Sequence, residues 1–272
     1  MKRGLFFLIL VAIWASQGRA DGGSDLKTLM TGDDSRGWQA VGRLNLGSRS
    51  FCTGSLIAPD LVLTAAHCLF DSDTGERIAD AEVEFLADWR GGRAAAYRGV
   101  KRSLIHPDFT FTDGNFADRV ASDVAILELD QPIRNSTITP FSTEARAGRG
   151  AEVGVVSYAK DRADSPSLQE VCHVLARQGG SLVLSCDVDF GSSGAPVFVI
   201  ENGEPRIVSL VSAKAKVSGE PVALGTALQA PLAELLALRR ASDGVFTRQQ
   251  PKVRRLSLGE TQSATGAKFL RP

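Results

Sequence analysis

"DFGSSGAPVF", residues 189–198, sets two adjacent serines between two glycines and continues into an apolar run. Acyl transfer needs a hydroxyl nucleophile and two backbone N–H donors aimed at the developing oxyanion. A turn flanked by glycines lets the backbone approach a substrate carbonyl without obstruction by side chains. Glycine–serine clusters also occur in ordinary loops, so this stretch predicts a nucleophile only if the rest of the chain supplies a base.

The chain contains three histidines, and His67 is the candidate base. It lies in "LTAAHCLF", residues 63–70, at the end of an apolar run and beside Cys68. An imidazole takes a proton from a hydroxyl only when it is fixed within hydrogen-bond reach. The alternative interpretation of His67 is a half-buried structural histidine. His106 precedes a proline and predicts an extended loop, whereas His173 adjoins a cysteine in a predicted strand.

An imidazole base also needs an acidic group that orients it, and Asp123 is the candidate. It begins the apolar run "DVAILEL", residues 123–129. A carboxylate at the mouth of so apolar a strand is costly to bury unless it has a partner. The other candidate aspartates have simpler explanations. Solvation in a polar, glycine-containing loop explains Asp108, Asp113 and Asp118, and a turn at the end of the same strand explains Asp130.

Together these three segments resemble the chymotrypsin-like (trypsin-fold) serine peptidases. "TAAHC" at 64–68 is similar to the histidine motif of that family, "SDVAILEL" at 122–129 to its aspartate strand, and "GSSGAP" at 191–196 to its nucleophile turn. The likeness runs from about residue 36 to residue 241. The order His, Asp, Ser argues against an α/β-hydrolase, in which the serine comes first and the histidine last.

The resemblance implies a catalytic triad of His67, Asp123 and Ser193, with the N–H groups of Gly191 and Ser193 forming the oxyanion hole. It also implies that the "IVSLV" stretch at 207–211 holds the substrate backbone. The implied substrate-binding residues are Asp187, Ser209 and Val211. The expected activity is that of an exported serine endopeptidase acting on a protein or peptide substrate, and the alternative is a non-catalytic binding protein on a peptidase fold.

Primary specificity is left between two possibilities. Asp187 stands six residues before Ser193, where the trypsin branch carries the acid that selects Arg or Lys. Val211 stands where trypsins have a glycine, and it would narrow the pocket and favour small side chains. Val208 occupies the strand position at which the glutamyl branch has a histidine, so cleavage after glutamate is disfavoured.

Two departures from animal trypsins indicate a bacterial exported member of the family, either glutamyl-endopeptidase-like or HtrA-like. Ser192 replaces the aspartate that precedes the nucleophile, and Ala195 replaces a glycine after it. The chain also lacks the Ile-Val-Gly-Gly start whose freed amine pairs with that aspartate. An oxyanion hole with an uncharged Ser192 should not depend on such an ion pair.

The fold class expected is all-β. Many short Val-, Ile- and Leu-rich runs separated by glycine, proline and aspartate predict a barrel or sandwich. The resemblance implies two packed six-stranded antiparallel β-barrels, about 36–135 and 150–230. One convincing helix is expected, at 231–241, with Pro231 in its first turn. The remaining segments are an N-terminal extension at 21–35, a polar connector at 131–150 and a basic, disordered tail at 242–272, for which a docking arm is the alternative.

Residues 1–20 have the basic start, the short apolar core and the small-residue exit of a secretory signal peptide. A secreted or periplasmic protein is therefore expected, as a monomer without membrane attachment after cleavage. Export favours disulfides, and of the three possible pairings the local ones are Cys52 with Cys68 and Cys172 with Cys186. No Cys-x-x-Cys or histidine cluster suggests a metal or cofactor. With 31 basic and 31 acidic residues, there is no electrostatic case for nucleic acid.

Overall fold

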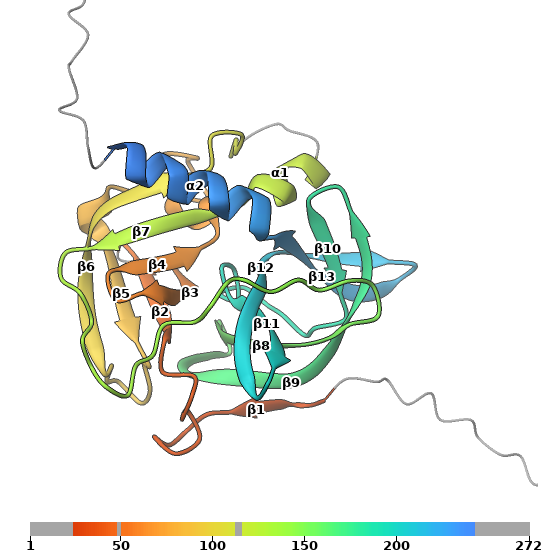
Figure 1. Cartoon of the computed structure of the whole chain (residues 1–272), viewed down its shortest axis with the longest axis horizontal. Coiled ribbons are helices and arrows are strands. Elements are labelled where there is room, and N and C mark those ends of the chain that lie inside the picture. Colours follow the sequence, from red (N-terminus) through yellow and green to blue (C-terminus); the bar gives the residue numbers. More distant parts are fainter. Residues whose placement is uncertain (1–23, 48–49, 112–115, 243–272) are drawn as a thin grey trace, which may run out of the picture.

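The computed structural model of the 272-residue chain describes residues 24–47, 50–111 and 116–242 (Figure 1). The expected signal peptide at 1–20 lies outside the described residues. So does the expected basic tail, apart from its first residue, Ser242.

Six antiparallel strands form a closed barrel in the first half of the chain. Around the barrel the order is β2-β3-β4-β7-β6-β5, and the bounds are β2 (Val41–Leu46), β3 (Ser50–Ala58), β4 (Leu61–Thr64), β5 (Val83–Ala87), β6 (Ala96–Ile105) and β7 (Ala125–Leu129). Every residue of β4 and β7 is buried, which accounts for their nearly continuous apolar sequences. Closure leaves this sheet with no free edge.

The second half of the chain supplies most of a seven-stranded sheet, in the order β1-β9-β10-β13-β12-β11-β8. The bounds are β1 (Leu26–Thr28), β8 (Glu152–Ala159), β9 (Arg162–Gln178), β10 (Ser181–Leu184), β11 (Pro196–Glu201), β12 (Glu204–Val217) and β13 (Glu220–Ala227). Strand β8 pairs with both β9 and β11, so six of these strands form a closed circuit to which β1 is added. The prediction of an all-β fold with two six-stranded barrels is confirmed.

Four short helical segments complete the described structure: η1 (Ala66–Leu69), η2 (Asp80–Glu82), α1 (Phe116–Ser122) and α2 (Gln229–Ser242). The predicted C-terminal helix is confirmed as α2, which begins two residues before Pro231 and lies beside the first barrel (Figure 1). The sequence did not predict α1. No helix in the described part of the chain is long and apolar enough to cross a membrane.

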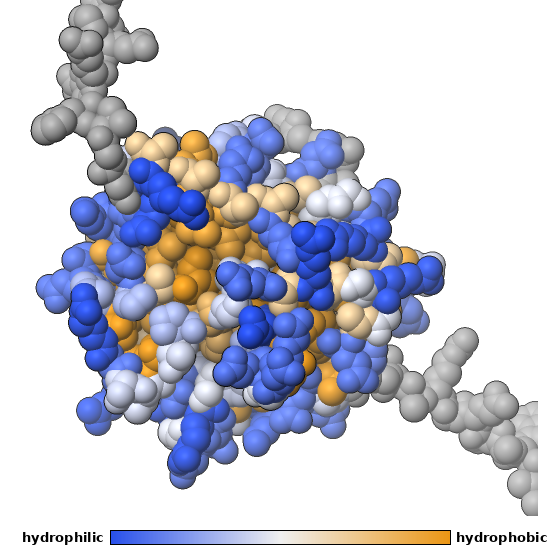
Figure 2. Space-filling model, viewed as in Figure 1, coloured by the Kyte–Doolittle hydropathy of each residue, from blue (hydrophilic) through white to orange (hydrophobic). Residues whose placement is uncertain are grey.

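The described residues form two apolar clusters, and the larger one extends across the contact between the barrels. The larger apolar cluster fills the first barrel and also includes buried residues of the second sheet, among them Val156, Tyr158, Phe198 and Leu210. A smaller cluster fills the second barrel around the disulfide of Cys172. Hydrophilic side chains cover most of the face shown in Figure 2, with apolar residues visible between them.

The segment expected as an N-terminal extension packs against the second barrel. Strand β1 pairs with β9, with Leu26 opposite Gln169. The next residue after the strand, Leu29, is fully buried in the main core, and Ser35 is buried as well. We therefore propose that the folded domain begins near residue 24, ahead of the expected boundary at residue 36.

This placement predicts that Leu29→Ala lowers the free energy of unfolding by about 2–5 kcal/mol, because it leaves a cavity in the core. Met30→Ala is the matched control, since the Met30 side chain is 66% exposed, and its effect should stay within about 0.5 kcal/mol. Urea unfolding of both variants measures the difference. Equal, small effects would show that this segment is a detachable extension.

Candidate active site

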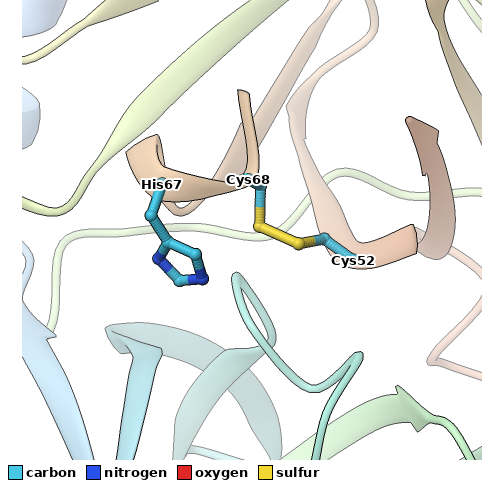
Figure 3. Close-up of side chains that lie close together, drawn as sticks. All are labelled: Cys52, His67 and Cys68. Atoms are coloured by element: carbon cyan, nitrogen blue, oxygen red, sulfur yellow. A yellow bond between two sulfur atoms is a disulfide. The ribbon is translucent and has the colours of Figure 1, made fainter. Parts of the chain in front are cut away.

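His67 is held in a short turn that follows a buried strand of the first barrel. The turn η1 follows β4 directly, and Ala66, Cys68 and Leu69 of this turn are buried. A disulfide joins Cys68 to Cys52 on β3, as expected, so the turn is covalently attached to the neighbouring strand. Figure 3 shows the His67 ring pointing away from the turn, beside this disulfide. The imidazole therefore projects from a rigid backbone.

Asp123 contacts His67 through both of its carboxylate oxygens. Oδ1 accepts the backbone N–H of His67 at 2.8 Å, and Oδ2 lies 2.6 Å from His67 Nδ1. The Asp123 side chain is 3% exposed, whereas that of His67 is 29% exposed. Because one carboxylate fixes both the backbone and the ring of His67, the imidazole has a defined orientation with its other nitrogen, Nε2, left for a further partner.

Ser212 is a third member of this cluster, and the sequence analysis missed it. Its Oγ donates to Asp123 Oδ2 at 2.5 Å. The pairing of β12 with β13 shifts at this point, because Val211 lies opposite Gly225 and Ala213 opposite Leu224. Ser212 is thus the extra residue of a β-bulge, which redirects its side chain out of the regular alternation. The second Val-Ser pair in "IVSLVS" was the only sequence signal for it.

The surroundings of His67 favour its charged form. Burial disfavours the imidazolium, but the negative charge of Asp123 and its hydrogen bond outweigh burial and raise the pKa of His67 above 6.5. Burial alone would raise the pKa of Asp123. Its contacts with His67 and the hydrogen bond from Ser212 lower that pKa instead. The pair is therefore arranged to stabilise a carboxylate beside an imidazolium.

The nucleophile loop, residues 189–195, lies between β10 and β11. The N–H groups of Asp189 and Phe190 donate to Ser192 Oγ and Asp189 Oδ1, respectively. The N–H groups of Ser192, Gly194 and Ala195 donate to Asp189 O, Val211 O and Ser192 O, respectively. Among the described residues, no acceptor is found for the N–H groups of Gly191 and Ser193. These are the two donors expected to form an oxyanion hole.

Close packing explains both glycines of this loop. Gly191 has φ +96° and Gly194 has φ +76°. A Cβ at Gly191 would overlap the Phe51 ring, and a Cβ at Gly194 would overlap the Thr53 carbonyl. The loop therefore lies directly against β3 of the first barrel.

Strand β3 brings the nucleophile loop and the histidine turn together. Thr53 N–H donates to Ser193 O at 2.9 Å, and the adjacent Cys52 is bonded to Cys68, next to His67. No hydrogen bond joins Ser193 Oγ to His67 within the described ranges. Such bonds are often long in unliganded sites and tighten when substrate binds.

A cavity of about 320 Å³ lies over the His67 and Asp123 cluster. Both polar and apolar residues line it, and His67, Asp123 and Ser212 are among the polar ones. The apolar lining residues are Leu46, Phe51, Phe70, Phe111, Val120 and Ala213. A cavity of this size and mixed character suits the side chains of a bound peptide.

Ser209 and Val211, two of the expected substrate-binding residues, do not line this cavity. Ser209 is fully buried and donates to Thr226 O, and Val211 is 2% exposed in the apolar cluster of the second barrel. Strand β12 reaches Asp123 three residues after Ser209, at Ser212. Contact of Ser209 and Val211 with substrate stays a prediction.

Asp187, the third expected substrate-binding residue, is exposed beside the nucleophile loop. Its backbone N–H donates to Gln169 Oε1. The next acid in this loop, Asp189, lies 3.6 Å from Lys214 of β12. Arg162 also interacts electrostatically with Asp187 and Asp189. Two acids and two cations therefore lie near one another beside this loop.

His106 does not line the cavity over the His67 and Asp123 cluster, and the potential metal ligands near His67 do not form a metal site. His106 is buried and lies 3.4 Å from Glu234 of α2. The one cluster of potential metal ligands among the described residues is Cys52, Cys68 and His67. Both of its sulfurs are consumed in the disulfide, which leaves a single ligand.

Comparisons with known proteins agree with this geometry. The model of the trypsin-like peptidase domain matches residues 52–205, a range that contains His67, Asp123 and Ser193. A glutamyl endopeptidase of Bacillus licheniformis is 27% identical over 177 residues, covering 65% of this chain and 54% of that protein. The suppressor of tumorigenicity 14 protein homolog of Bos taurus is 35% identical over 109 residues, or 36% of this chain and 12% of that protein.

A solved structure is also similar, a Glu endopeptidase in complex with MPD. Its TM-score is 0.66 at 17% identity, with 81% of this chain and 98% of that chain covered. This likeness supports the fold. The chain spans about half the length of the Bacillus relative and a smaller part of the bovine one.

The contact between His67 and Asp123 predicts the titration of the imidazole. In the unaltered protein the His67 ring should titrate with a pKa above 6.5, because the carboxylate stabilises its charged form. Asp123→Asn removes that charge while burial remains, so the pKa should fall below the value of the unaltered protein. NMR titration of the ring resonances, assigned by their loss in His67→Ala, measures both values. An unchanged pKa in Asp123→Asn would contradict the proposed pairing.

Proposed function

This chain belongs to the trypsin-like peptidase family, and we propose that it is an exported serine endopeptidase that acts through His67, Asp123 and Ser193. The observation that carries the proposal is the double contact of the buried Asp123 with the backbone N–H and the Nδ1 of His67. A half-buried structural histidine does not need a carboxylate at both points. A general base does, because its tautomer and its direction must both be fixed.

In the first proposed step, Ser193 Oγ attacks the carbonyl carbon of the scissile peptide bond. As the new C–O bond forms, the hydroxyl proton passes to Nε2 of His67, and the carbonyl π electrons move to the oxygen. Asp123 holds the Nδ1 proton, so the lone pair of the neutral ring lies on Nε2, and it stabilises the imidazolium that results. The N–H groups of Gly191 and Ser193 donate hydrogen bonds to the developing oxyanion.

In the second step the oxyanion re-forms the carbonyl and the C–N bond breaks. The leaving amine takes the proton from His67 Nε2, which leaves an acyl ester on Ser193. Water then attacks this ester while His67 accepts one of its protons, and the collapse of the second tetrahedral intermediate returns a proton to Ser193 Oγ. The products are a new carboxyl group and a new amino group, and the enzyme is unchanged.

Export and the substrate class rest on separate observations. The disulfides Cys52–Cys68 and Cys172–Cys186 suit an oxidising compartment, as does the signal-like sequence at 1–20. The Bacillus relative and the similar solved structure are glutamyl endopeptidases by name, which supports a protein or peptide substrate. We propose that the protein acts as a monomer in the periplasm or outside the cell.

A fluorophosphonate probe tests the enzyme against the alternative of a binding protein on the same fold. The purified, folded protein should be labelled with one probe per chain, and Ser193→Ala should abolish labelling. Asp123→Asn should lower kcat by about 10⁴-fold with folding retained, by analogy with the Ser-His-Asp template. Absence of labelling in well-folded protein would support the binding protein.

Primary specificity is proposed to depend on Asp187, with cleavage after Arg or Lys. Profiling of a peptide library at the residue before the cut should show enrichment of Arg and Lys, which Asp187→Ser should remove. Because Arg162 opposes the charge of Asp187, Arg162→Gln should increase the enrichment. Asp161→Ser serves as the control, since Asp161 is also an exposed acid near Arg162. Enrichment of glutamate or of small residues in the unaltered protein would exclude this role for Asp187.

A further inference from the structure

Thr53 is a fully buried residue of the first barrel whose polar atoms reach into the second. Its backbone N–H donates to Ser193 O at 2.9 Å, and its Oγ1 donates to Gly191 O at 2.9 Å. The same Oγ1 accepts the N–H of Tyr158, on β8, at 3.1 Å. One side chain therefore links β3, the second barrel and the loop that carries the proposed nucleophile.

Successive carbonyl groups of this loop each accept a hydrogen bond, and their donors differ in kind. The carbonyl of Phe190 accepts Lys160 N–H, and that of Ser192 accepts Ala195 N–H. The carbonyl of Ser193 accepts Thr53 N–H. Each of these three bonds comes from a backbone donor, which is available whatever the side chain. The carbonyl of Gly191 differs, because its donor is the Thr53 hydroxyl.

The Gly191 carbonyl belongs to the peptide that lies between the two proposed oxyanion donors. That peptide joins Gly191 to Ser192, with the Gly191 N–H before it and the Ser193 N–H after it. Gly191 lacks a Cβ and has φ +96°, so its own backbone preferences do little to fix the orientation of this peptide. The N–H of this peptide, that of Ser192, donates to Asp189 O within the same loop, so a bond from outside the loop is needed to fix the peptide relative to the first barrel.

Of the residues around the loop, Thr53 is the one that donates a hydrogen bond to the Gly191 carbonyl. Ser192, which replaces an aspartate of animal trypsins, is buried and bonds to Ser157 Oγ and Tyr158 O within the second barrel. The Phe51 ring lies against Gly191 and carries the Arg43 guanidinium 4.4 Å from its centroid. That contact restricts space, but it offers no donor to the Gly191 carbonyl.

We propose that Thr53 is a positioning residue: its hydroxyl orients the Gly191–Ser192 peptide and thereby aims the N–H groups of Gly191 and Ser193 at the oxyanion. This inference rests on the proposed function of the site. Thr53 contacts neither the substrate nor the reacting atoms. It acts on the transition state through the two donors, whose geometry must hold to within about 0.5 Å.

The test compares Thr53→Val with Thr53→Ser. Valine keeps the shape and the backbone N–H but removes the hydroxyl, whereas serine retains the hydroxyl. Loss of one oxyanion donor lowers kcat by about 10²–10³-fold, so two misaligned donors in Thr53→Val should lower it by roughly 10–100-fold. KM should change little, and Thr53→Ser should stay within about threefold of the unaltered protein, as befits an effect confined to the transition state.

A second measurement separates positioning from a general loss of structure. A peptide boronate forms a tetrahedral adduct with the serine, so its affinity should fall in step with kcat/KM in Thr53→Val. Tyr158→Phe is the stability control, because it removes another buried hydrogen bond, from the Tyr158 hydroxyl to Trp89 O, without touching the loop. Its kcat and boronate affinity should be unchanged. If Thr53→Val does not fold, Thr53→Ala makes the same comparison.

Several outcomes would overturn the inference. They are an unchanged kcat in Thr53→Val, a rise in KM alone, an equal loss in Thr53→Ser, or an equal loss in Tyr158→Phe. The proposed function is checked in the same experiment by fluorophosphonate labelling of the unaltered protein. No labelling there would overturn both proposals, whereas normal labelling with an unaffected Thr53→Val would overturn this one alone.

Discussion

The buried carboxylate of Asp123 is the charge on which the arrangement of both barrels depends. A carboxylate with 3% of its side chain exposed is stable only if hydrogen-bond donors replace the water it has lost. Two of its donors come from the histidine turn of the first barrel, and the third, Ser212, comes from the second. The barrels must therefore pack in register for this charge to be satisfied. The interface and the proposed catalytic site are one structure.

The same interface holds the nucleophile loop. Thr53 reaches across it to two carbonyls of that loop, and Gly194 N–H bonds back to Val211 O beside the bulge at Ser212. Gly191 and Gly194 are both packed against the first barrel too closely for any Cβ. The loop thus takes its shape from contacts on both sides and carries little preference of its own. Neutral hydrogen bonds, rather than an ion pair with a chain terminus, hold the buried Ser192.

The sequence was sufficient to predict a strand where an apolar run and a recognisable motif coincide. Strands β4 and β7 are buried along their whole length, so their Val-, Leu- and Ile-rich sequences identified them and the residues at their ends, His67 and Asp123. The strands missed were β1, β6 and β13, and β9 was predicted only around His173. In β9, a proline and alternating polar residues hide a 17-residue strand.

The sequence does not show which serine of β12 contacts Asp123. "IVSLVS" contains two Val-Ser pairs three residues apart, and in a regular strand that odd spacing puts their serines on opposite faces. Which serine faces Asp123 depends on a bulge, which the sequence does not mark. The placement of residues 24–35 was hidden for a similar reason, since a three-residue strand and one buried leucine give almost no pattern.

The disulfide beside His67 can form only in an oxidising compartment. In a reducing compartment Cys52 and Cys68 remain thiols, and the turn that carries the histidine lacks its covalent link to β3. In the exported enzyme proposed above, a newly made chain would complete this turn only after leaving the compartment in which it was synthesised, and the proteins of that compartment would not meet the completed site.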